Sequence, residues 1–203
     1  VTGGAGFIGV HLTKKILNEG HRVSVIDNFE TSSRLNIEQF FQNENYCFIF
    51  GDIRDDNIMD KLCKDADYII HLAAAVGVQI IVNNPLHVLE TNIFGTEKVF
   101  QFALKYSVPI MITSTSEVYG KGIKVPFSED DDVVLGPTKY ARWAYGASKM
   151  VDEFLGLAYH DKYKHPVTII RLFNTSGPGQ SGQYGMVIPV FVKQAIKGDP
   201  ITV

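Results

Sequence analysis

Three evenly spaced glycines near the start of the chain limit its possible folds more than any other feature. Gly3, Gly6 and Gly9 lie between a short apolar segment and a stretch with helical periodicity. Glycine lets the backbone turn tightly and lets a phosphate approach it closely. The free N–H groups at the start of the following helix favour an anion. A turn of this kind between a strand and a helix predicts a phosphate site in an α/β domain.

Short apolar segments alternate with longer helical stretches along the rest of the chain. We expect strands at 23–26, 46–50, 68–70, 110–112 and 167–170. We expect helices at 10–18, 57–64, 85–106, 141–163 and 188–196. Strands that are apolar throughout are buried on both faces, as in a parallel sheet covered by helices. The pattern predicts an α/β fold with a doubly wound parallel sheet, the Rossmann arrangement.

The character of the chain changes near residue 175. Residues 175–185 are rich in glycine and serine, and the helix expected at 188–196 comes after them. We therefore expect residues 1–175 to form a dinucleotide-binding domain. We expect residues 176–203 to begin a smaller substrate-binding lobe, of which this chain holds only the first part.

Composition excludes several classes of protein. Of the 203 residues, 45% are hydrophobic and 20% are charged, which is ordinary for a soluble globular protein with its own core. A formal net charge of −3 gives no basic field for nucleic acid or an anionic membrane. No apolar run approaches the ~20 residues of a membrane span, so we expect a cytoplasmic protein. Cys47 and Cys63 form neither a disulfide framework nor a Cys/His ligand pattern, and we expect no metal site.

Two acidic residues stand at the ends of later strands. Asp27 ends the strand expected after the glycine turn, where a carboxylate can accept both ribose hydroxyls of a dinucleotide. A carboxylate there repels a 2′-phosphate, which favours NAD over NADP; the alternative is a turn former beside Asn28. Asp52 ends the next expected strand, beside Ile53, and suits adenine recognition. It could equally cap a helix.

Tyr145 and Lys149 lie four residues apart in an expected helix and so share one face of it. An ammonium beside a phenol favours the phenolate, so we expect the pKa of Tyr145 to fall below its usual value of about 10. Tyr145 could then act as a general base near neutral pH. Taken alone, such a pair fits a surface role better.

Hydroxyl and acidic side chains crowd the end of the strand expected at 110–112. The run Thr113-Ser-Thr-Ser-Glu-Val-Tyr119 places them at the carboxyl end of a strand, where α/β sheets bind ligands. If the strand geometry persists, Thr115 and Glu117 face one way and Ser116 faces the other. The alternative is that these hydroxyls cap loop backbone.

Taken together, these segments resemble the extended short-chain dehydrogenase/reductase family, and within it the NAD-dependent nucleotide-sugar epimerases, dehydratases and decarboxylases. The stretches that carry the resemblance are Thr2-Gly-Gly-Ala-Gly-Phe-Ile-Gly9, His71-Leu-Ala-Ala74, Ser114-Thr-Ser-Glu-Val-Tyr-Gly120, Tyr145-x-x-x-Lys149 and Arg171-Leu-Phe-Asn-Thr175. The resemblance implies that Tyr145 is the catalytic base and that Lys149 holds the nicotinamide ribose. It implies that Thr115 binds the sugar 4-hydroxyl and that Asn174 contacts the nucleotide-sugar phosphates. The residues that it implies contact NAD are Gly3, Gly6, Phe7, Ile8, Gly9, Asp27, Asn28, Asp52, Ile53, Leu72, Ala73, Ala74, Asn92, Tyr145 and Lys149.

The resemblance also implies a shared first step, in which C4 of the sugar gives a hydride to NAD⁺ and becomes a ketone. Ser116 and Glu117 are the candidate catalytic residues for the later steps. The run that ends in Glu117 resembles UDP-glucuronate decarboxylases most, although Gly179 stands where those proteins usually have arginine. A UDP-hexose 4-epimerase is the alternative, and a 4,6-dehydratase and a non-catalytic NAD sensor rank below it. The helices at 85–106 and 141–163 resemble those that pair in a homodimer.

Overall fold

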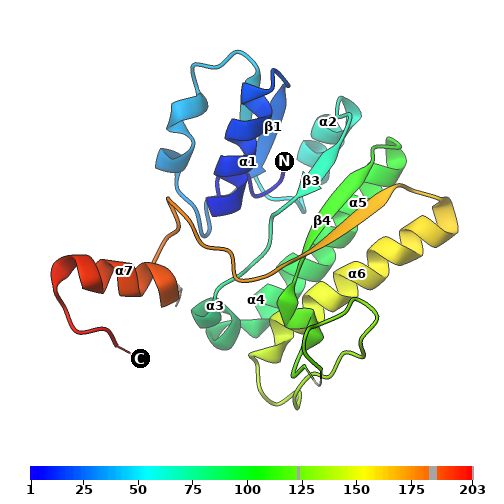
Figure 1. Cartoon of the computed structure of the whole chain (residues 1–203). Helices are drawn as coiled ribbons and strands as arrows, with labels where there is room; N and C mark the ends of the chain where they lie inside the picture. Colours follow the sequence, from blue (N-terminus) through cyan, green and yellow to red (C-terminus); the bar gives the residue numbers. More distant parts are fainter. Residues whose placement is uncertain (123, 183–186, 203) are drawn as a thin grey trace.

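A computed structural model of the chain describes residues 1–122, 124–182 and 187–202. Its strands, in chain order, are β1 Val23–Asp27, β2 Tyr46–Phe50, β3 Ile69–His71, β4 Ile110–Thr115 and β5 Val167–Leu172. Each paired strand runs parallel to its neighbour (Figure 1). The expected parallel α/β fold is confirmed, with strand ends that differ by up to three residues from the expected ones.

Thr2 joins the two halves of the sheet. β1 pairs with β2, and β4 lies between β3 and β5. Thr2 forms parallel bridges to Ile26 in β1 and to His71 in β3. The resulting order is β2, β1, the segment at Thr2, β3, β4 and β5, which is the doubly wound order. Sheets of this kind bind ligands where the strand order reverses, and that point lies directly before the glycine turn.

Helices pack on both faces of the sheet (Figure 1). Alternate residues of β1 belong to two separate cores, because successive side chains of a strand point to opposite faces. Ile26 packs in the core that includes α2 (Asp56–Lys64), α5 (Gly95–Lys105) and one side of α6 (Trp143–Tyr163). Val25 packs in the other core, with residues of α1 (Phe7–Asn18). This core also includes Ile37, which lies between the 3₁₀ turns η1 (Arg34–Asn36) and η2 (Glu38–Phe40), and Phe40 of η2.

The helix expected at 85–106 consists of three segments. α4 (Pro85–Leu89) leads into η3 (Glu90–Phe94), which is a π-helix, and α5 continues from it. π-Helical turns are rare inside α-helices and occur often at functional sites. A further short helix, α3 (Val78–Asn83), precedes them and was not expected from the sequence. Its six residues are too few to produce a clear helical period.

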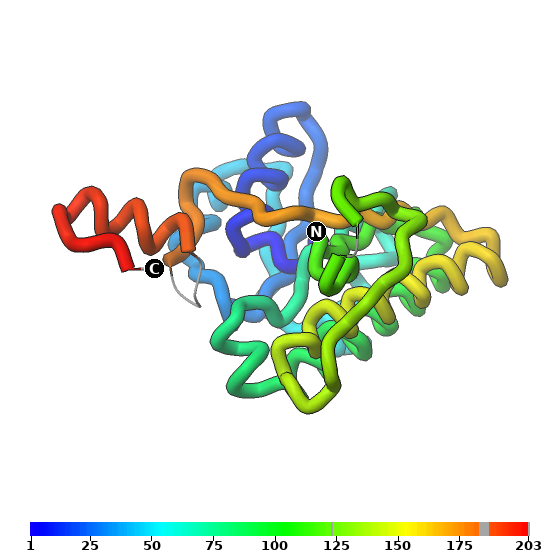
Figure 2. Tube along the Cα trace, turned by 60° about the horizontal axis from the view of Figure 1, so that its bottom comes forward, coloured from blue at the N-terminus to red at the C-terminus, as the bar shows by residue number. Residues whose placement is uncertain are grey.

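α7 (Val187–Lys197) lies at one end of the molecule, beyond the long segment that leaves β5 (Figure 2). None of its residues is buried. The expected helix at 188–196 is confirmed, whereas residues 183–186 of the expected glycine-rich loop, and Val203, lie outside the described residues. In the described part of the chain, no helix combines the length and the apolar character needed to cross a membrane.

Candidate functional site

A cavity of about 570 Å³ lies at the carboxyl ends of the strands. This size is within the range of about 300–1,000 Å³ that is typical of small-molecule sites. The cavity brings together almost all of the residues predicted for the site, and Ser116 and Asn92 are the two that do not line it. The predicted residues that line it are Gly3, Gly6, Phe7, Ile8, Gly9, Asp27, Asn28, Asp52, Ile53, Leu72, Ala73, Ala74, Thr115, Glu117, Tyr145, Lys149 and Asn174.

The glycine turn has no room for side chains at two of its positions. Gly3 has a φ of +67°, and a Cβ there would lie 2.7 Å from the main-chain nitrogen of Ala73. A Cβ at Gly9 would lie 2.5 Å from the carbonyl oxygen of Gly3. No side chain caps α1 at Gly6, so its first N–H groups are left for another acceptor. Such an uncapped helix start beside a cavity fits a phosphate group.

Asp27 accepts three hydrogen bonds. Its Oδ2 accepts from the main-chain N–H of Ala5 at 3.0 Å. Its Oδ1 accepts from the N–H of Phe29 at 2.9 Å and from the hydroxyl of Ser32 at 2.8 Å. The carboxylate therefore organises the turn after β1, as one interpretation of Asp27 predicts. It also lines the cavity, and ribose binding by Asp27 stays a prediction.

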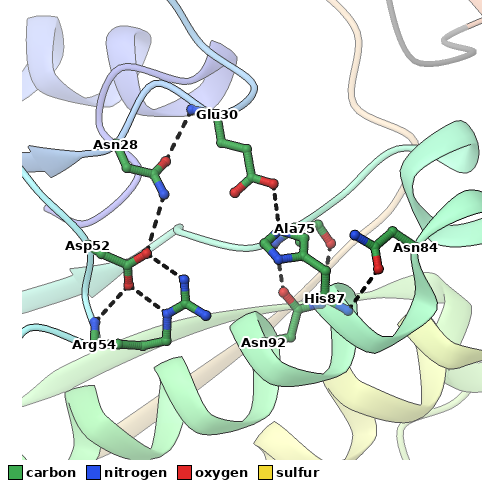
Figure 3. Close-up of polar contacts among 8 residues, drawn as sticks. All are labelled: Asn28, Glu30, Asp52, Arg54, Ala75, Asn84, His87 and Asn92. Atoms are coloured by element: carbon green, nitrogen blue, oxygen red, sulfur yellow. Dashed lines mark hydrogen bonds and ion pairs between the residues drawn. The ribbon is translucent and has the colours of Figure 1, made fainter.

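Asp52 is held by Arg54 rather than by a helix. The guanidinium of Arg54 donates two hydrogen bonds to it, at 2.8 and 2.7 Å (Figure 3). These bonds are the main reason that the pKa of Asp52 lies below its usual value. The interpretation of Asp52 as a helix cap is wrong, because the carboxylate that caps α2 is Asp55, which accepts from the N–H groups of Asn57 and Ile58.

Asn28 connects this pair to the other side of the cavity. Its amide donates to Asp52 at 3.4 Å, and its carbonyl oxygen accepts from the N–H of Glu30 at 3.1 Å. The Glu30 carboxylate in turn lies 2.5 Å from Nε2 of His87 in α4 (Figure 3). Glu30 lines the cavity and is missing from the sequence-based expectations, since nothing in its spacing marks it.

The strand geometry expected beyond Thr115 does not occur. β4 ends at Thr115, and residues Ser116–Tyr119 form a 3₁₀ turn, η4. The Thr115 hydroxyl caps this turn by accepting from the N–H of Glu117 at 3.2 Å. Thr115 and Glu117 nevertheless both line the cavity, because the turn and not strand alternation brings Glu117 back to it. Burial raises the pKa of the Glu117 carboxyl, and Arg142 opposes that shift.

The pKa of Tyr145 is raised, which corrects the prediction that Lys149 lowers it. Burial of the phenol is the largest cause, and the carboxylates of Glu117 and Asp152 add to it. A hydrogen bond with Thr115 acts in the opposite direction. Tyr145 and Thr115 therefore meet at the cavity as predicted, but the surroundings of the phenol favour its protonated form.

Lys149 donates its hydrogen bond to Asp152, and the distance from Nζ to Oδ2 is 2.9 Å. Both side chains are almost fully buried, with 2% and 0% of their surfaces exposed. The sequence-based expectations do not include Asp152, although its place three residues after Lys149 in a helix is a signal for pairing.

In the described part of the chain, no group of three or more His, Cys, Asp or Glu side chains is arranged to hold a metal.

Asn92 lies behind the cavity wall instead of in it. Asn92 belongs to the π-helix η3. Its side-chain oxygen accepts from the main-chain N–H of Ala75 at 2.8 Å, and its side-chain amide donates to the main-chain carbonyl of Ala75. The amide also donates to Ser148 at 3.1 Å, and Ser148 donates to the carbonyl of Tyr145 at 2.8 Å. The predicted cofactor contact of Asn92 is thus replaced by a link between the wall at Ala75 and the helix of Tyr145.

The whole chain, residues 1–203, matches a protein family described as GDP-mannose 4,6 dehydratase. A UDP-N-acetyl-alpha-D-glucosaminuronate decarboxylase from Bacillus cytotoxicus is 42% identical over 204 residues, which are 100% of this chain and 62% of the relative. UDP-glucuronic acid decarboxylase 1 of Xenopus tropicalis is 36% identical over 203 residues, which are 100% of this chain and 47% of the relative.

A crystal structure of DesIV, a dTDP-glucose 4,6-dehydratase from Streptomyces venezuelae with NAD bound, has the same fold. Its TM-score is 0.87 at 30% sequence identity, and the match covers 97% of this chain and 61% of that one. The chain thus spans less than two thirds of each of these three proteins. The match along its whole length shows that the chain belongs to the NAD-dependent nucleotide-sugar epimerase and dehydratase family of the extended short-chain dehydrogenases/reductases.

Proposed function

We propose that this chain is the dinucleotide-binding part of a UDP-uronate decarboxylase, with UDP-glucuronate as the favoured substrate. The observation that carries the proposal is the presence of Glu117 in one cavity with Thr115, Tyr145 and Lys149. Relatives that are decarboxylases of UDP-linked uronic acids support it. Residues 1–175 form the dinucleotide-binding domain in this proposal, and residues 176–203 begin the lobe that holds the sugar nucleotide.

The cavity fits NAD. The backbone packs tightly at Gly3 and Gly9, and α1 starts beside this turn without a cap, so its first N–H groups are left for a phosphate. The carboxylate of Asp27 lies on the cavity wall, where it can accept from ribose hydroxyls and repel a 2′-phosphate. The hydroxyl of Ser114, buried on the same wall, has no hydrogen-bond partner among the described residues and is available to a ligand.

NAD⁺ held in this cavity would supply a hydride acceptor for C4 of the sugar and, once reduced, a hydride donor for the return step of the same turnover. Tyr145 takes the proton of the 4-hydroxyl, and Thr115 holds that hydroxyl beside it. The resulting 4-keto uronic acid is a β-keto acid, which loses CO₂ readily. Glu117 then donates a proton to C5, a role that suits a carboxyl whose pKa is raised by burial. Asn174, on the rim of the cavity, contacts the phosphates of the sugar nucleotide.

A UDP-hexose 4-epimerase is the second candidate function. Thr115, Tyr145 and Lys149 are sufficient for removing and returning a hydride at C4, and epimerisation makes no use of Glu117. Gly179, in place of the arginine typical of decarboxylases, favours this alternative. The fold does not separate the two, because the dehydratase DesIV shares it as well.

The protein is a homodimer in this proposal. Large apolar side chains are exposed on α4, η3 and α6, namely Leu86, Phe94, Phe154 and Leu157. Exposed apolar side chains on neighbouring helices are typical of an interface. Sedimentation of the full-length protein tests this assembly, and a monomer at micromolar concentration would contradict it.

The decisive experiment supplies the full-length protein with UDP-glucuronate, UDP-N-acetylglucosaminuronate and UDP-glucose separately and measures product masses. Loss of CO₂ from a uronate supports the proposal, and products of unchanged mass from UDP-glucose alone support the epimerase. Glu117→Gln is expected to slow protonation at C5, so that the 4-keto sugar still forms and CO₂ is still released while the final sugar nucleotide accumulates slowly. Glu129→Gln, in an exposed loop, is the matched control and should keep full activity.

A further inference from the structure

Asp152 is a buried carboxylate with one strong partner and no place in the proposed mechanism. Its Oδ2 accepts the hydrogen bond from Lys149, and its side chain is fully buried. Its Oδ1 has no hydrogen-bond partner among the described residues. Burial raises the pKa of the Asp152 carboxyl, and the Lys149 ammonium and the Thr96 hydroxyl oppose that shift. Lys149 lines the cavity and Asp152 does not, so the carboxylate binds the ammonium from behind the cavity wall.

A row of buried polar groups fixes the surroundings of Asp152. Nε2 of His71 lies 3.0 Å from the hydroxyl of Thr96, and its Nδ1 lies 2.7 Å from the hydroxyl of Thr2. The Thr2 hydroxyl also accepts from the N–H of Ala73 at 3.2 Å. Because these side chains are almost fully buried, this row leaves little freedom for the Lys149–Asp152 pair to rearrange.

The charges around Tyr145 come from three elements. Glu117 faces it from η4, with Arg142 beside Glu117 just before α6. Lys149 and Asp152 belong to α6, the helix of Tyr145 itself. His71 of β3, next to Lys149, is neutral because burial and the Lys149 charge lower its pKa to about 3. Asp152 and Glu117 are thus the negative groups that act on the phenol.

We infer that Asp152 is a positioning residue, whose buried carboxylate anchors the Lys149 ammonium behind the cavity and places a negative charge two helical turns from the Tyr145 phenol. Both effects oppose formation of the phenolate, so Asp152 lowers the fraction of Tyr145 that is ready to accept a proton. The catalytic meaning of this role rests on the proposed function, in which Tyr145 removes the proton of the sugar hydroxyl. The effect on the phenol itself does not depend on any substrate.

Seven residues of helix separate Tyr145 from Asp152, which is about 10 Å along the axis. At an effective dielectric constant of about 20, removal of a unit charge at that distance changes a pKa by about one unit. Asp152→Asn removes the charge and keeps an oxygen that can accept from Lys149. Asp152→Ser also removes the charge and keeps a hydroxyl oxygen that can accept from Lys149. It provides a second test if Asp152→Asn does not fold.

The experiment follows Tyr145 directly, by NMR titration of full-length protein labelled with ¹³C at tyrosine Cζ, with the signal assigned by its loss in Tyr145→Phe. We expect the signal to titrate about one pH unit lower in Asp152→Asn and in Asp152→Ser than in the parent protein. Asp152→Glu should return it toward the parent value. Asp161→Asn, at an exposed position of the same helix, should leave it unchanged.

The inference is overturned if neither charge-removing variant titrates at lower pH than the parent, or if Asp161→Asn produces the same shift. Because no sugar or cofactor is present, this outcome is independent of the product assay. If the Tyr145 signal titrates at lower pH in the Asp152 variants while the parent protein releases no CO₂ from UDP-uronates, the role of Asp152 stands and decarboxylation is rejected.

Discussion

The main-chain N–H of Ala5 donates a hydrogen bond of 3.0 Å to the carboxylate of Asp27, so the glycine turn and the end of β1 hold each other in place. The two residues are 22 positions apart in the sequence. Asp27 also accepts from Phe29 and Ser32, which fixes the loop that leaves β1. The residue proposed to bind the ribose thus also shapes the phosphate site next to it.

Asp27→Ala is expected to lower both stability and affinity for NAD. The substitution leaves three donors without their acceptor, and the free energy of unfolding should fall by roughly 1–3 kcal/mol. Urea unfolding measures this change, and calorimetric titration measures NAD binding. Ser32→Ala removes only one of the three donors and should change stability by about 1 kcal/mol or less. Equal effects of the two substitutions would contradict the role of Asp27 as the shared acceptor.

Gly3→Ala is expected to be much more damaging than Gly20→Ala. Both glycines have positive φ angles, +67° and +83°, so both substitutions strain the backbone by roughly 1 kcal/mol. Only at Gly3 would the new Cβ also meet backbone, at 2.7 Å from the nitrogen of Ala73, whereas nothing lies within 4 Å at Gly20. Thermal unfolding should rank the variants in this order, and NAD binding should be lost at Gly3 alone.

Asn92→Ala is expected to destabilise the cavity wall. The substitution leaves the buried N–H of Ala75 without an acceptor, which lowers the free energy of unfolding by roughly 1–3 kcal/mol. Gln101→Ala, which removes an exposed amide from α5, is the matched control and should change stability very little. An equally small effect at Asn92 would show that Ala75 finds another partner, such as water.

Stability is expected to fall as the pH drops below about 6.5, through His71. The pKa of His71 is about 3 in the folded protein, chiefly because of burial, against about 6.5 in an unfolded chain. Below 6.5 the unfolded state therefore binds a proton that the folded state excludes, and unfolding is favoured. Between pH 7 and pH 5.5 the loss should be about 1 kcal/mol.

Urea unfolding of the parent and of His71→Gln at these two pH values measures the contribution of His71. The pH dependence should be weaker in the variant by about that amount. His21→Gln, at an exposed position, should keep the full pH dependence of the parent protein. If His71→Gln keeps it too, another group is responsible.

The fold could be predicted from the sequence because its elements are marked by local patterns. Apolar runs indicated the strands, and the glycine turn indicated an α/β domain with a phosphate site. The cavity residues were predictable for a related reason, since carboxyl ends of parallel strands meet at one edge of the sheet. Thr115 was placed at this edge in this way, whereas Tyr145, in a helix, was joined to it only by the family resemblance.

The rest depends on tertiary contacts that local patterns do not determine. Burial and nearby carboxylates outweigh the effect of Lys149 on the pKa of Tyr145, and only packing determines burial. The pairing of Lys149 with Asp152 is a matter of which way one side chain turns. Ser116 was placed by strand alternation, but the chain forms a 3₁₀ turn after Thr115.

The π-helical segment Glu90–Phe94 has a consequence for any change in the length of this helix. One residue of an α-helix occupies about 100° of rotation, so an extra residue in a π-turn turns everything after it by that angle. The buried residues on the two sides of the segment, Val88 in α4 and the buried face of α5, are therefore set relative to each other by the π-turn. A redesign that deletes one residue to regularise the helix would rotate Asn92 away from Ala75 or move the buried face of α5 into solvent.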